Sequence, residues 1–248
     1  MKLQKLLSYT RRAVDDYDMI HEGDKIAIGI SGGKDSLAML YALHGLQRIY
    51  PNKFELHAIS IKLGIEPFDL KNVSELCEVL NIPFTIIDTQ IGPIVFDERK
   101  ENNPCSLCSK MRKGALNNAA VELGCNRVAL GHNKDDIIET VMMSMFFESR
   151  YYCFPPVTHL SRIDLYTIRP LLYVPELEVR QFSKIYDLPI VKSPCPVDGN
   201  TKREYIKNLI KEQSHQFPGL PNRLFKGLQT SQVEGWMLKD IKTSTTTI

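Results

Sequence analysis

The segment Gly29–Ser36 (GISGGKDS) constrains the fold more than any other part of the chain. It follows an apolar run, Lys25–Ile30, that is typical of a short buried strand, and it precedes a helical pattern over Ser36–Ile49. Glycine tolerates positive φ, so successive backbone N–H groups in such a loop can converge on one anion. The helix that follows adds the positive end of its dipole at the same point. The pattern predicts a phosphate site at the carboxyl end of the first strand of an α/β sheet.

Several side chains of this loop suit a phosphate ligand. Ser31 and Ser36 offer hydroxyl donors, and Lys34 can neutralise the remaining phosphate charge. Asp35 is either a metal-linked carboxylate or an ordinary acid in the first turn of a helix. The distance between glycine and lysine differs from that of the GxxxxGK[ST] loop, so this is another class of phosphate loop. The residues expected to contact the nucleotide here are Gly29, Ser31, Gly32, Gly33, Lys34, Asp35 and Ser36.

Strand and helix patterns alternate after the loop. The strand-like runs lie at 54–61, 83–88, 127–130 and 166–171. The helical patterns lie at 70–80, 108–123, 135–147 and 176–186. This alternation predicts βαβ units and a parallel sheet covered on both faces, which is the α/β, Rossmann-like class. We expect an N-terminal helix (1–20), a nucleotide-binding domain (21–198), and a C-terminal helical segment with a polar tail (199–248). Pro218 and Pro221 are expected to break the helical segment in two.

The composition excludes several classes of protein. The 248 residues are 43% hydrophobic and 24% charged, close to the average of globular proteins. No apolar run approaches the roughly 20 residues of a membrane helix, and the first residues lack the apolar stretch of a signal peptide. We therefore expect a cytoplasmic protein without a membrane partner. The net charge of +2 is too small to indicate nucleic-acid binding by itself.

Three of the six cysteines form a pattern of their own. Cys105 and Cys108 stand in NPCSLC, and Cys195 lies between two prolines. The sequence has no second CxxC pair, which excludes a four-cysteine zinc ribbon. Three cysteines without a fourth suit a [4Fe–4S] cluster with one iron left open for a sulfide or a substrate atom. The other cysteines lie in apolar patterns and are expected to be small buried hydrophobes: Cys77, Cys125 and Cys153.

Two other interpretations of the three cysteines stay open. One is a structural zinc ion held by the cysteines and by His132 or His215. The other is a CxxC pair that works by disulfide chemistry.

A second polar segment, Gly131–Asp136 (GHNKDD), follows the fourth strand-like run. Because the carboxyl ends of neighbouring strands share one crevice, Asp135 and Asp136 can hold Mg²⁺ or orient a substrate, although acids at a helix start are also ordinary caps. Arg169 ends a later strand at the same edge, where it either pairs with a phosphate or forms a structural ion pair. Ser60 and Gly29 lie where the ribose and adenine of a nucleotide would pass.

The motifs together resemble those of a known family. The loop SGGKDS, then PCSLCSKMRKG, ALGHNKDD and IRPL, and a proline-flanked cysteine before TKRE are similar to the tRNA 2-thiocytidine synthetase (TtcA) group of the TtcA/TtuA family of PP-loop ATPases. The similarity extends to about Gln229. Paired zinc-binding CxxC motifs at the ends, as in TtuA enzymes, are missing from this sequence, which favours the TtcA side.

The resemblance implies an activity and its components. Family members use ATP and Mg²⁺ to adenylate the C2 oxygen of a cytidine at anticodon-loop position 32 of tRNA, and they replace it with sulfur. The implied catalytic residues are Lys34, Cys105, Cys108, Asp135 and Cys195, with the three cysteines holding a [4Fe–4S] cluster; the implied nucleotide contacts add Ser60, Gly131, Asp135 and Arg169 to the loop. The implied partners are tRNA, a sulfur donor (a cysteine desulfurase or free sulfide) and, from the resemblance alone, a second copy of the chain.

Basic residues flank both parts of the cysteine set and are expected to contact RNA phosphates. They are Lys110, Arg112 and Lys113 beside the CxxC, and Lys202, Arg203 and Lys207 after Cys195. Solvated helix faces are the alternative for both groups. Other functions that fit part of the pattern are thiolation of a uridine or a small molecule, addition of an amine to adenylated RNA, and a non-catalytic nucleotide-binding redox sensor.

Overall fold

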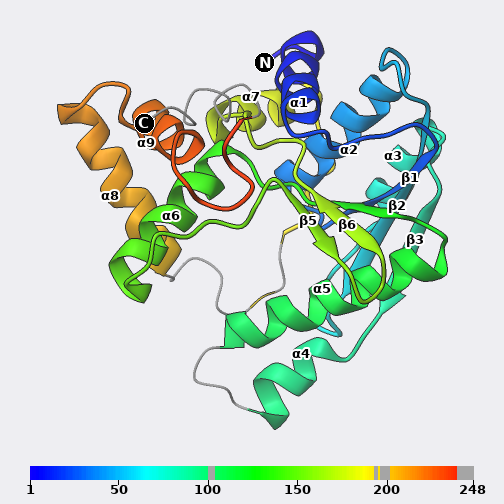
Figure 1. Cartoon of the computed structure of the whole chain (residues 1–248). Helices are drawn as coiled ribbons and strands as arrows, with labels where there is room; N and C mark the ends of the chain where they lie inside the picture. The colour runs from blue at the N-terminus through cyan, green and yellow to red at the C-terminus, as the bar shows by residue number, and fades with distance from the viewer. Residues whose placement is uncertain (100–103, 193–194, 196–201, 239–248) are drawn as a thin grey trace.

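A six-stranded sheet in the order β3-β2-β1-β4-β6-β5 forms the centre of the computed structural model (Figure 1). The structure describes residues 1–99, 104–192, 195 and 202–238. The strands are β1 (Asp24–Gly29), β2 (Phe54–Lys62), β3 (Phe84–Asp88), β4 (Arg127–Ala129), β5 (Val157–Leu160) and β6 (Leu165–Ile168). Strands β3, β2, β1, β4 and β6 run parallel, and β5 pairs antiparallel with β6. The α/β class predicted from the alternation is confirmed, but the edge strand β5 was not predicted.

The helices lie close to their predicted positions. They are α1 (Leu3–Asp16), α2 (Lys34–Gln47), α3 (Lys71–Val79), α4 (Ile91–Pro93) with the π turn η1 (Ile94–Glu98), α5 (Pro104–Glu122), α6 (Lys134–Glu148), α7 (Glu176–Ile185), α8 (Lys202–Gln216) and α9 (Leu220–Gln229). Helix α5 begins four residues earlier than predicted, since proline is well suited to the first turn of a helix. Cys105 therefore stands in its first turn, and Cys108 lies about one turn further along.

Helices cover both faces of the sheet, and successive side chains along each strand point to opposite faces. Ile26 and Ile28 of β1 belong to a core shared with α1, α2 and α7, whereas Ala27 faces the core formed with α5. Figure 1 shows α5 crossing one face of the sheet, with α1, α2 and α7 on the other. Because helices cover both faces, the sequences of the central strands are continuous apolar runs. The same arrangement leaves the carboxyl ends of β1 and β4 open to the loops that carry the polar motifs.

The C-terminal segment packs into the main core. Phe225, Leu228 and Trp236 are buried in the same cluster as the residues of α1 and α2. The indole of Trp236 lies edge-on to Phe225 and Tyr17, with ring centroids 5.8 and 5.9 Å away, and its Nε1 donates to the carbonyl of Phe154 at 3.1 Å. The helical break falls at Pro218 and Gly219, and Pro221 sits inside the start of α9, so only the first of the two prolines separates the helices. The boundaries 1–20, 21–198 and 199–248 stay a prediction.

No helix within the described ranges is long and apolar enough to cross a bilayer.

Replacing Trp236 with alanine should destabilise the whole domain, because it removes a fully buried indole that joins the last described turn to α1 and α9. Large-to-small changes of this kind cost about 3–5 kcal/mol. Chemical denaturation would measure the loss. The matched control is Leu177→Ala, whose side chain is 66% exposed and whose change should stay within about 0.5 kcal/mol. Equal stability of the two variants would show that the C-terminal segment is not part of the core.

Candidate nucleotide and cysteine site

The predicted phosphate loop joins the end of β1 to an uncapped helix. The first N–H groups of an α-helix have no intrahelical acceptor. Gly33, which precedes α2 in an extended conformation, has no side chain to cap them. Gly32 has φ +78°, and a Cβ built there would lie 3.0 Å from Cβ of Val191. The hydroxyls of Ser31 and Ser36 lie 3.2 Å apart and organise the loop, since Ser36 Oγ also donates to the Gly33 carbonyl at 2.9 Å. Serines, glycine turn and helix start are therefore assembled as the sequence predicts for an anion site.

Asn133 ties this loop to the second polar segment. Its side-chain oxygen caps α6 by accepting from the N–H groups of Asp135 and Asp136, at 2.9 and 3.1 Å. Its side-chain Nδ2 donates to Oδ1 of Asp35 at 2.9 Å. Gly131 allows the close approach, because a Cβ there would lie 3.1 Å from the backbone of Asp35. The two loops after β1 and β4 thus form one unit at the carboxyl edge of the sheet.

Lys34 sits in a network of carboxylates. Its Nζ lies 2.7 Å from Oδ2 of Asp35 and 3.1 Å from Oε1 of Glu176 at the start of α7. Glu176 is also paired with Arg180 at 2.9 Å and with Lys207 of α8 at 2.9 Å. Burial opposes ionisation of Glu176, but these cations outweigh it and lower its pKa to about 2. Lys34 is therefore held at the loop by acids that a phosphate can replace as its partner.

The pKa of a second carboxyl in the same cavity shifts in the opposite direction. Glu139 of α6 is 5% exposed, and burial raises its pKa to about 7 even though Arg203 of α8 lies 3.1 Å away. Burial likewise raises the pKa of Asp136, against the hydrogen bond from the Asn133 N–H and the nearby charge of Arg203. A cavity of about 260 Å³ opens between these groups and the phosphate loop. We call it the loop pocket; it is lined by Lys34, Asp35, Asn133, Asp135, Asp136, Glu139, Glu176, Arg203, Glu204 and Lys207.

Arg169 and His132 are buried beside the loop pocket in a positive environment. Arg169 donates to the Pro155 carbonyl at 2.5 Å, and burial lowers its pKa to about 10. Burial, together with the charges of Arg169, Arg203 and Lys113, lowers the pKa of His132 to about 3, so this imidazole is neutral at pH 7. Among the described residues, Nδ1 of His132, Nε of Arg169 and Oγ of Ser60 have no hydrogen-bond partner. Buried polar atoms of this kind are costly unless a ligand or water completes them.

The structure brings Cys108 within electrostatic reach of the two other predicted ligands. Burial raises the pKa of the Cys108 thiol, the guanidinium of Arg112 lowers it, and the neighbouring Cys195 and Cys105 raise it again. Cys105 is exposed, Cys108 is buried under Val95 and Leu63, and Cys195 is half-buried. The segment after β3 supplies part of this cover through Ile91 of α4 and Val95 of η1. Cys77, Cys125 and Cys153 are buried as predicted.

The donor set fits an iron–sulfur cluster better than a single ion. Its members are three thiols, and iron–sulfur clusters bind thiolates. In the described part of the chain, no three potential ligands are gathered tightly enough for one metal ion. The thiolate ligands of a cluster bind different irons and stand farther apart than the ligands of one zinc ion. For Mg²⁺, Asp35, Asp135 and Asp136 all line the loop pocket, which suits an ion that takes one or two carboxylates and completes its shell with substrate phosphates.

The predicted RNA contacts fall into two groups. Lys110 and Arg112 are exposed on α5 beside the cysteines. Arg203 and Lys207 instead face the loop pocket through Glu139 and Glu176, and Lys202 lies 4.9 Å from the ring centroid of Phe147. Lys113 is exposed on the same helix, and partial burial together with the charge of Arg169 lowers its pKa.

Three residues of the site were missed from the sequence. Asn133 was not singled out, although N-x-x-D before an apolar helix is a capping-box signature that identifies it. Glu139 and Glu176 gave no signal, because acids on a helix are ordinary and only the packing of α6, α7 and α8 brings them to Lys34 and Arg203. Asp135, expected to bind Mg²⁺ or the substrate, also accepts from the N–H of Glu176 at 2.7 Å and so anchors α7.

Comparison with known proteins identifies the group of sequences to which these features belong. A family model described as the PP-loop domain matches residues 3–214. A tRNA-cytidine(32) 2-sulfurtransferase of Methylobacillus flagellatus is 34% identical over 227 residues, which cover 90% of this chain and 74% of the relative. An enzyme of the same name from Shewanella baltica is 36% identical over 238 residues, 93% of this chain and 76% of the relative. The U34-tRNA thiolase NcsA of Methanococcus maripaludis, solved with its [4Fe–4S] cluster, superposes with a TM-score of 0.72 at 29% identity, over 89% of this chain and 76% of that one.

The two abnormal carboxyls should give opposite pH dependence of stability. Because the pKa of Glu176 in the folded protein is about 2, below the usual 4.5, its ionised form stabilises the fold above pH 4.5, and this is lost as the pH falls toward 2. We expect Glu176→Gln to lower the free energy of unfolding at pH 7 by about 3 kcal/mol, with a difference that shrinks between pH 4.5 and pH 3. Denaturant titrations of both proteins across this range would measure it.

Glu139→Gln provides the opposing control in the same pocket. The folded pKa of about 7 lies above 4.5, so the wild-type carboxyl favours the fold fully below pH 4.5 and loses that contribution as the pH rises through 7. Wild type should therefore lose stability relative to Glu139→Gln as the pH rises from 4.5 to 8. The same pH trend for both variants would contradict the assigned charge states.

Proposed function

We propose, from the premise that this chain belongs to the PP-loop family and to its tRNA 2-thiocytidine synthetase group, that it replaces the C2 oxygen of cytidine 32 in tRNA with sulfur. Curated relatives named for this reaction cover nine-tenths of the chain. The proposal makes the protein an ATP-dependent sulfurtransferase that carries a [4Fe–4S] cluster.

One observation supports this function most strongly. Cys108 senses the charge of both Cys105 and Cys195, although Cys195 lies far along the sequence from the other two. A phosphate loop alone is shared by enzymes with many acceptors, whereas three thiols brought together in the same chain are needed only where sulfur or a metal takes part. The thiolase with a TM-score of 0.72 was solved with a [4Fe–4S] cluster, which agrees with that donor set.

The residues of the loop pocket suit the activation step. We assign the N–H groups at the start of α2, with Ser31 and Ser36, to the β- and γ-phosphates of ATP, where the helix dipole favours negative charge. Lys34 exchanges Asp35 or Glu176 for a phosphate oxygen. Asp35 and Asp135 would hold the Mg²⁺, which when bound would neutralise charge on the phosphates. The C2 oxygen of the cytidine attacks the α-phosphate, the bond to the β-phosphate breaks, and pyrophosphate leaves. Arg169 is assigned to the charge that develops on the α-phosphate.

The cysteines serve the second half of the reaction. Cys105, Cys108 and Cys195 would hold the cluster, which when bound supplies an open iron as sulfur carrier and Lewis acid. A sulfur nucleophile then attacks C2, the bond from C2 to the adenylated oxygen breaks, and AMP leaves. The exchange of oxygen for sulfur therefore needs no oxidant or reductant. Burial raises the pKa of the Cys108 thiol, and the guanidinium of Arg112 opposes that rise, so Arg112 would favour the thiolate that a cluster binds.

The remaining partners follow from this chemistry. Lys110 and Arg112 are placed to meet RNA phosphates beside the cysteines, and with Lys113, Lys202, Arg203 and Lys207 they form the proposed RNA surface. A cysteine desulfurase or free sulfide supplies the sulfur. A homodimer is proposed from the resemblance to the family and not from this chemistry. The tRNA substrate is the reason to place the enzyme in the cytoplasm.

Uridine is the second candidate base. The structurally similar enzyme from Methanococcus maripaludis is a U34-tRNA thiolase, and it is 29% identical to this chain. Nucleoside mass spectrometry of tRNA from cells with and without the gene decides between them. Loss of 2-thiocytidine supports the proposal; loss of a thiolated uridine with 2-thiocytidine intact overturns it in favour of the second candidate.

Replacing Cys108 with alanine should abolish thiolation without unfolding the protein. We expect the amount of 2-thiocytidine formed anaerobically with tRNA, ATP, Mg²⁺ and sulfide to fall at least about 100-fold, since even outer-shell changes at metal sites cost 10–100-fold. Cys105→Ala and Cys195→Ala should behave alike. Cys125→Ala is the matched control, because that thiol is also buried but lies in the core between α5 and the sheet. Full activity of the Cys108 variant would exclude the cluster from the reaction.

Gly32→Ala should weaken ATP binding at least tenfold, because an alanine is strained at φ +78° and its Cβ presses on Val191, which shifts the N–H groups of the loop. Isothermal titration with a non-hydrolysable ATP analogue would measure the affinity. Gly23→Ala is the control, since Gly23 has the same φ of +78° but no atom within 4 Å of the new Cβ. Gly23→Ala carries the same backbone strain without touching the phosphate loop. An equal loss of ATP affinity in both variants would therefore show that the loop does not bind ATP.

A further inference from the structure

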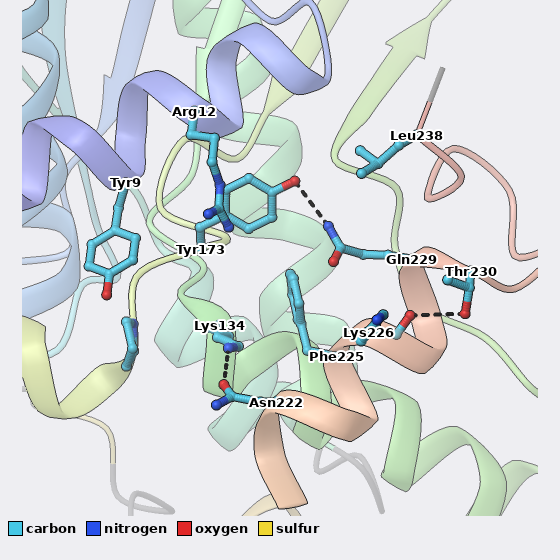
Figure 2. A pocket seen from close by; sticks show the side chains of 11 residues that line it. Tyr9, Arg12, Lys134, Tyr173, Asn222, Phe225, Lys226, Gln229, Thr230 and Leu238 are labelled. Atoms are coloured by element: carbon cyan, nitrogen blue, oxygen red, sulfur yellow. Dashed lines mark hydrogen bonds between the residues drawn. The ribbon is translucent and has the colours of Figure 1, made fainter. Parts of the chain in front are cut away.

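A second cavity, outside the site described above, lies between α1, α9 and the start of α6 (Figure 2). Its volume is about 510 Å³, within the usual range for small-molecule sites. We call it the α1–α9 pocket; it is lined by Tyr9, Arg12, Lys134, Tyr173, Pro175, Asn222, Phe225, Lys226, Gln229, Thr230 and Leu238. No sequence motif pointed to it, because its lining comes from the two ends of the chain and from two loops between them.

The lining of the α1–α9 pocket is positive. Arg12, Lys134 and Lys226 contribute cations, and among the residues that the structure describes no carboxylate lines the cavity. None of the three forms an ion pair within the described chain; the guanidinium of Arg12 lies 4.2 Å from the ring centroid of Tyr173, and Lys134 donates to Asn222 at 2.6 Å. Burial lowers the pKa of Lys134, Asp135 raises it, and the charge of Arg12 lowers it. These cations repel one another in a partly buried space, so the pocket favours an anion.

The same pocket presents flat rings and polar edges. Figure 2 shows Tyr9, Tyr173 and Phe225 around the cavity, with Asn222, Gln229 and Thr230 on the α9 side. The Tyr173 hydroxyl donates to Asp16 at 2.7 Å and accepts from Gln229 Nε2 at 3.0 Å, which fixes that ring. Aromatic rings bind nucleic-acid bases by stacking, and amide groups can bond to their edges. A ligand with both a phosphate and a planar base matches this lining.

The α1–α9 pocket shares a wall with the loop pocket. Asn133 and Asp135 line the loop pocket, while Lys134 between them lines the α1–α9 pocket. In the same way, Glu176 faces one cavity and Pro175 the other. A polynucleotide held in the α1–α9 pocket therefore lies next to the place where ATP is activated.

We propose that the α1–α9 pocket binds one nucleotide of the substrate RNA, other than the base that reacts, with its phosphate against Arg12, Lys134 and Lys226 and its base against Tyr9, the half-buried ring of the lining. This inference rests on the proposed function, which makes tRNA the substrate. It assigns α9, which the sequence analysis treated only as a C-terminal helix, to RNA binding.

The test compares Lys226→Gln and Arg12→Gln with wild type in tRNA binding, measured by fluorescence anisotropy over a range of salt concentrations. Each variant should bind tRNA several-fold more weakly, and the slope of log Kd against log salt should fall by about one, the value for loss of one phosphate contact. Lys53→Gln is the matched control, because Lys53 is an exposed lysine directly before β2, at the amino ends of the parallel strands rather than at their carboxyl ends. Two variants on different helices keep the test valid if one fails to fold.

The outcomes separate this inference from the proposed function. Wild-type affinity and slope in both folded variants would overturn the inference. Binding of cytidine or adenosine 5′-monophosphate that both variants lose, with tRNA affinity unchanged, would make the ligand a free nucleotide and would also overturn it. Weakened tRNA binding in both variants, with Lys53→Gln unaffected, supports it; if the wild type then thiolates no tRNA, only the proposed function fails.

Discussion

The side-chain amide of Asn133 holds the candidate site together. Its oxygen caps α6 and its nitrogen binds Asp35, so the loops after two neighbouring parallel strands are fixed to each other by one buried residue. Asp35 in turn holds Lys34, and Asp135 of the same capped turn holds the start of α7. An amide suits this place because it accepts and donates at once, whereas a carboxylate would repel Asp35. The phosphate loop, the acids of the loop pocket and the start of α7 are all positioned through this contact.

Periodicity and local chemistry predicted most of the fold. The strand–loop–helix at Gly29–Ser36 and the alternation after it were sufficient for the α/β class, because these signals lie within single elements. The edge strand β5 was missed since Val157–Leu160 is short and half-exposed, with a burial pattern that resembles a loop. Helix α5 begins at Pro104, earlier than the predicted start at Cys108, because proline fits the first turn of a helix and the chain before Cys108 is already helical.

The site was predictable where a motif carries it and not where packing creates it. The glycine loop, the three cysteines and Asp135 stand in recognisable segments. Glu176, Glu139 and the α1–α9 pocket depend on how α1, α6, α7, α8 and α9 meet, and no single segment encodes that. The pKa values of Glu176 and Glu139 diverge for the same reason: three cations surround the first, while burial dominates at the second. Two carboxyls with separated pKa values in one pocket are a frequent mark of functional sites.

The central claim is that three thiols and the phosphate loop serve one reaction. Iron anomalous scattering from anaerobic crystals grown with a non-hydrolysable ATP analogue tests it most directly. The account predicts iron bound to Cys105, Cys108 and Cys195, with the analogue's phosphates on the N–H groups that follow Gly32. Iron bound elsewhere, or a nucleotide whose phosphates lie away from that loop, would contradict it.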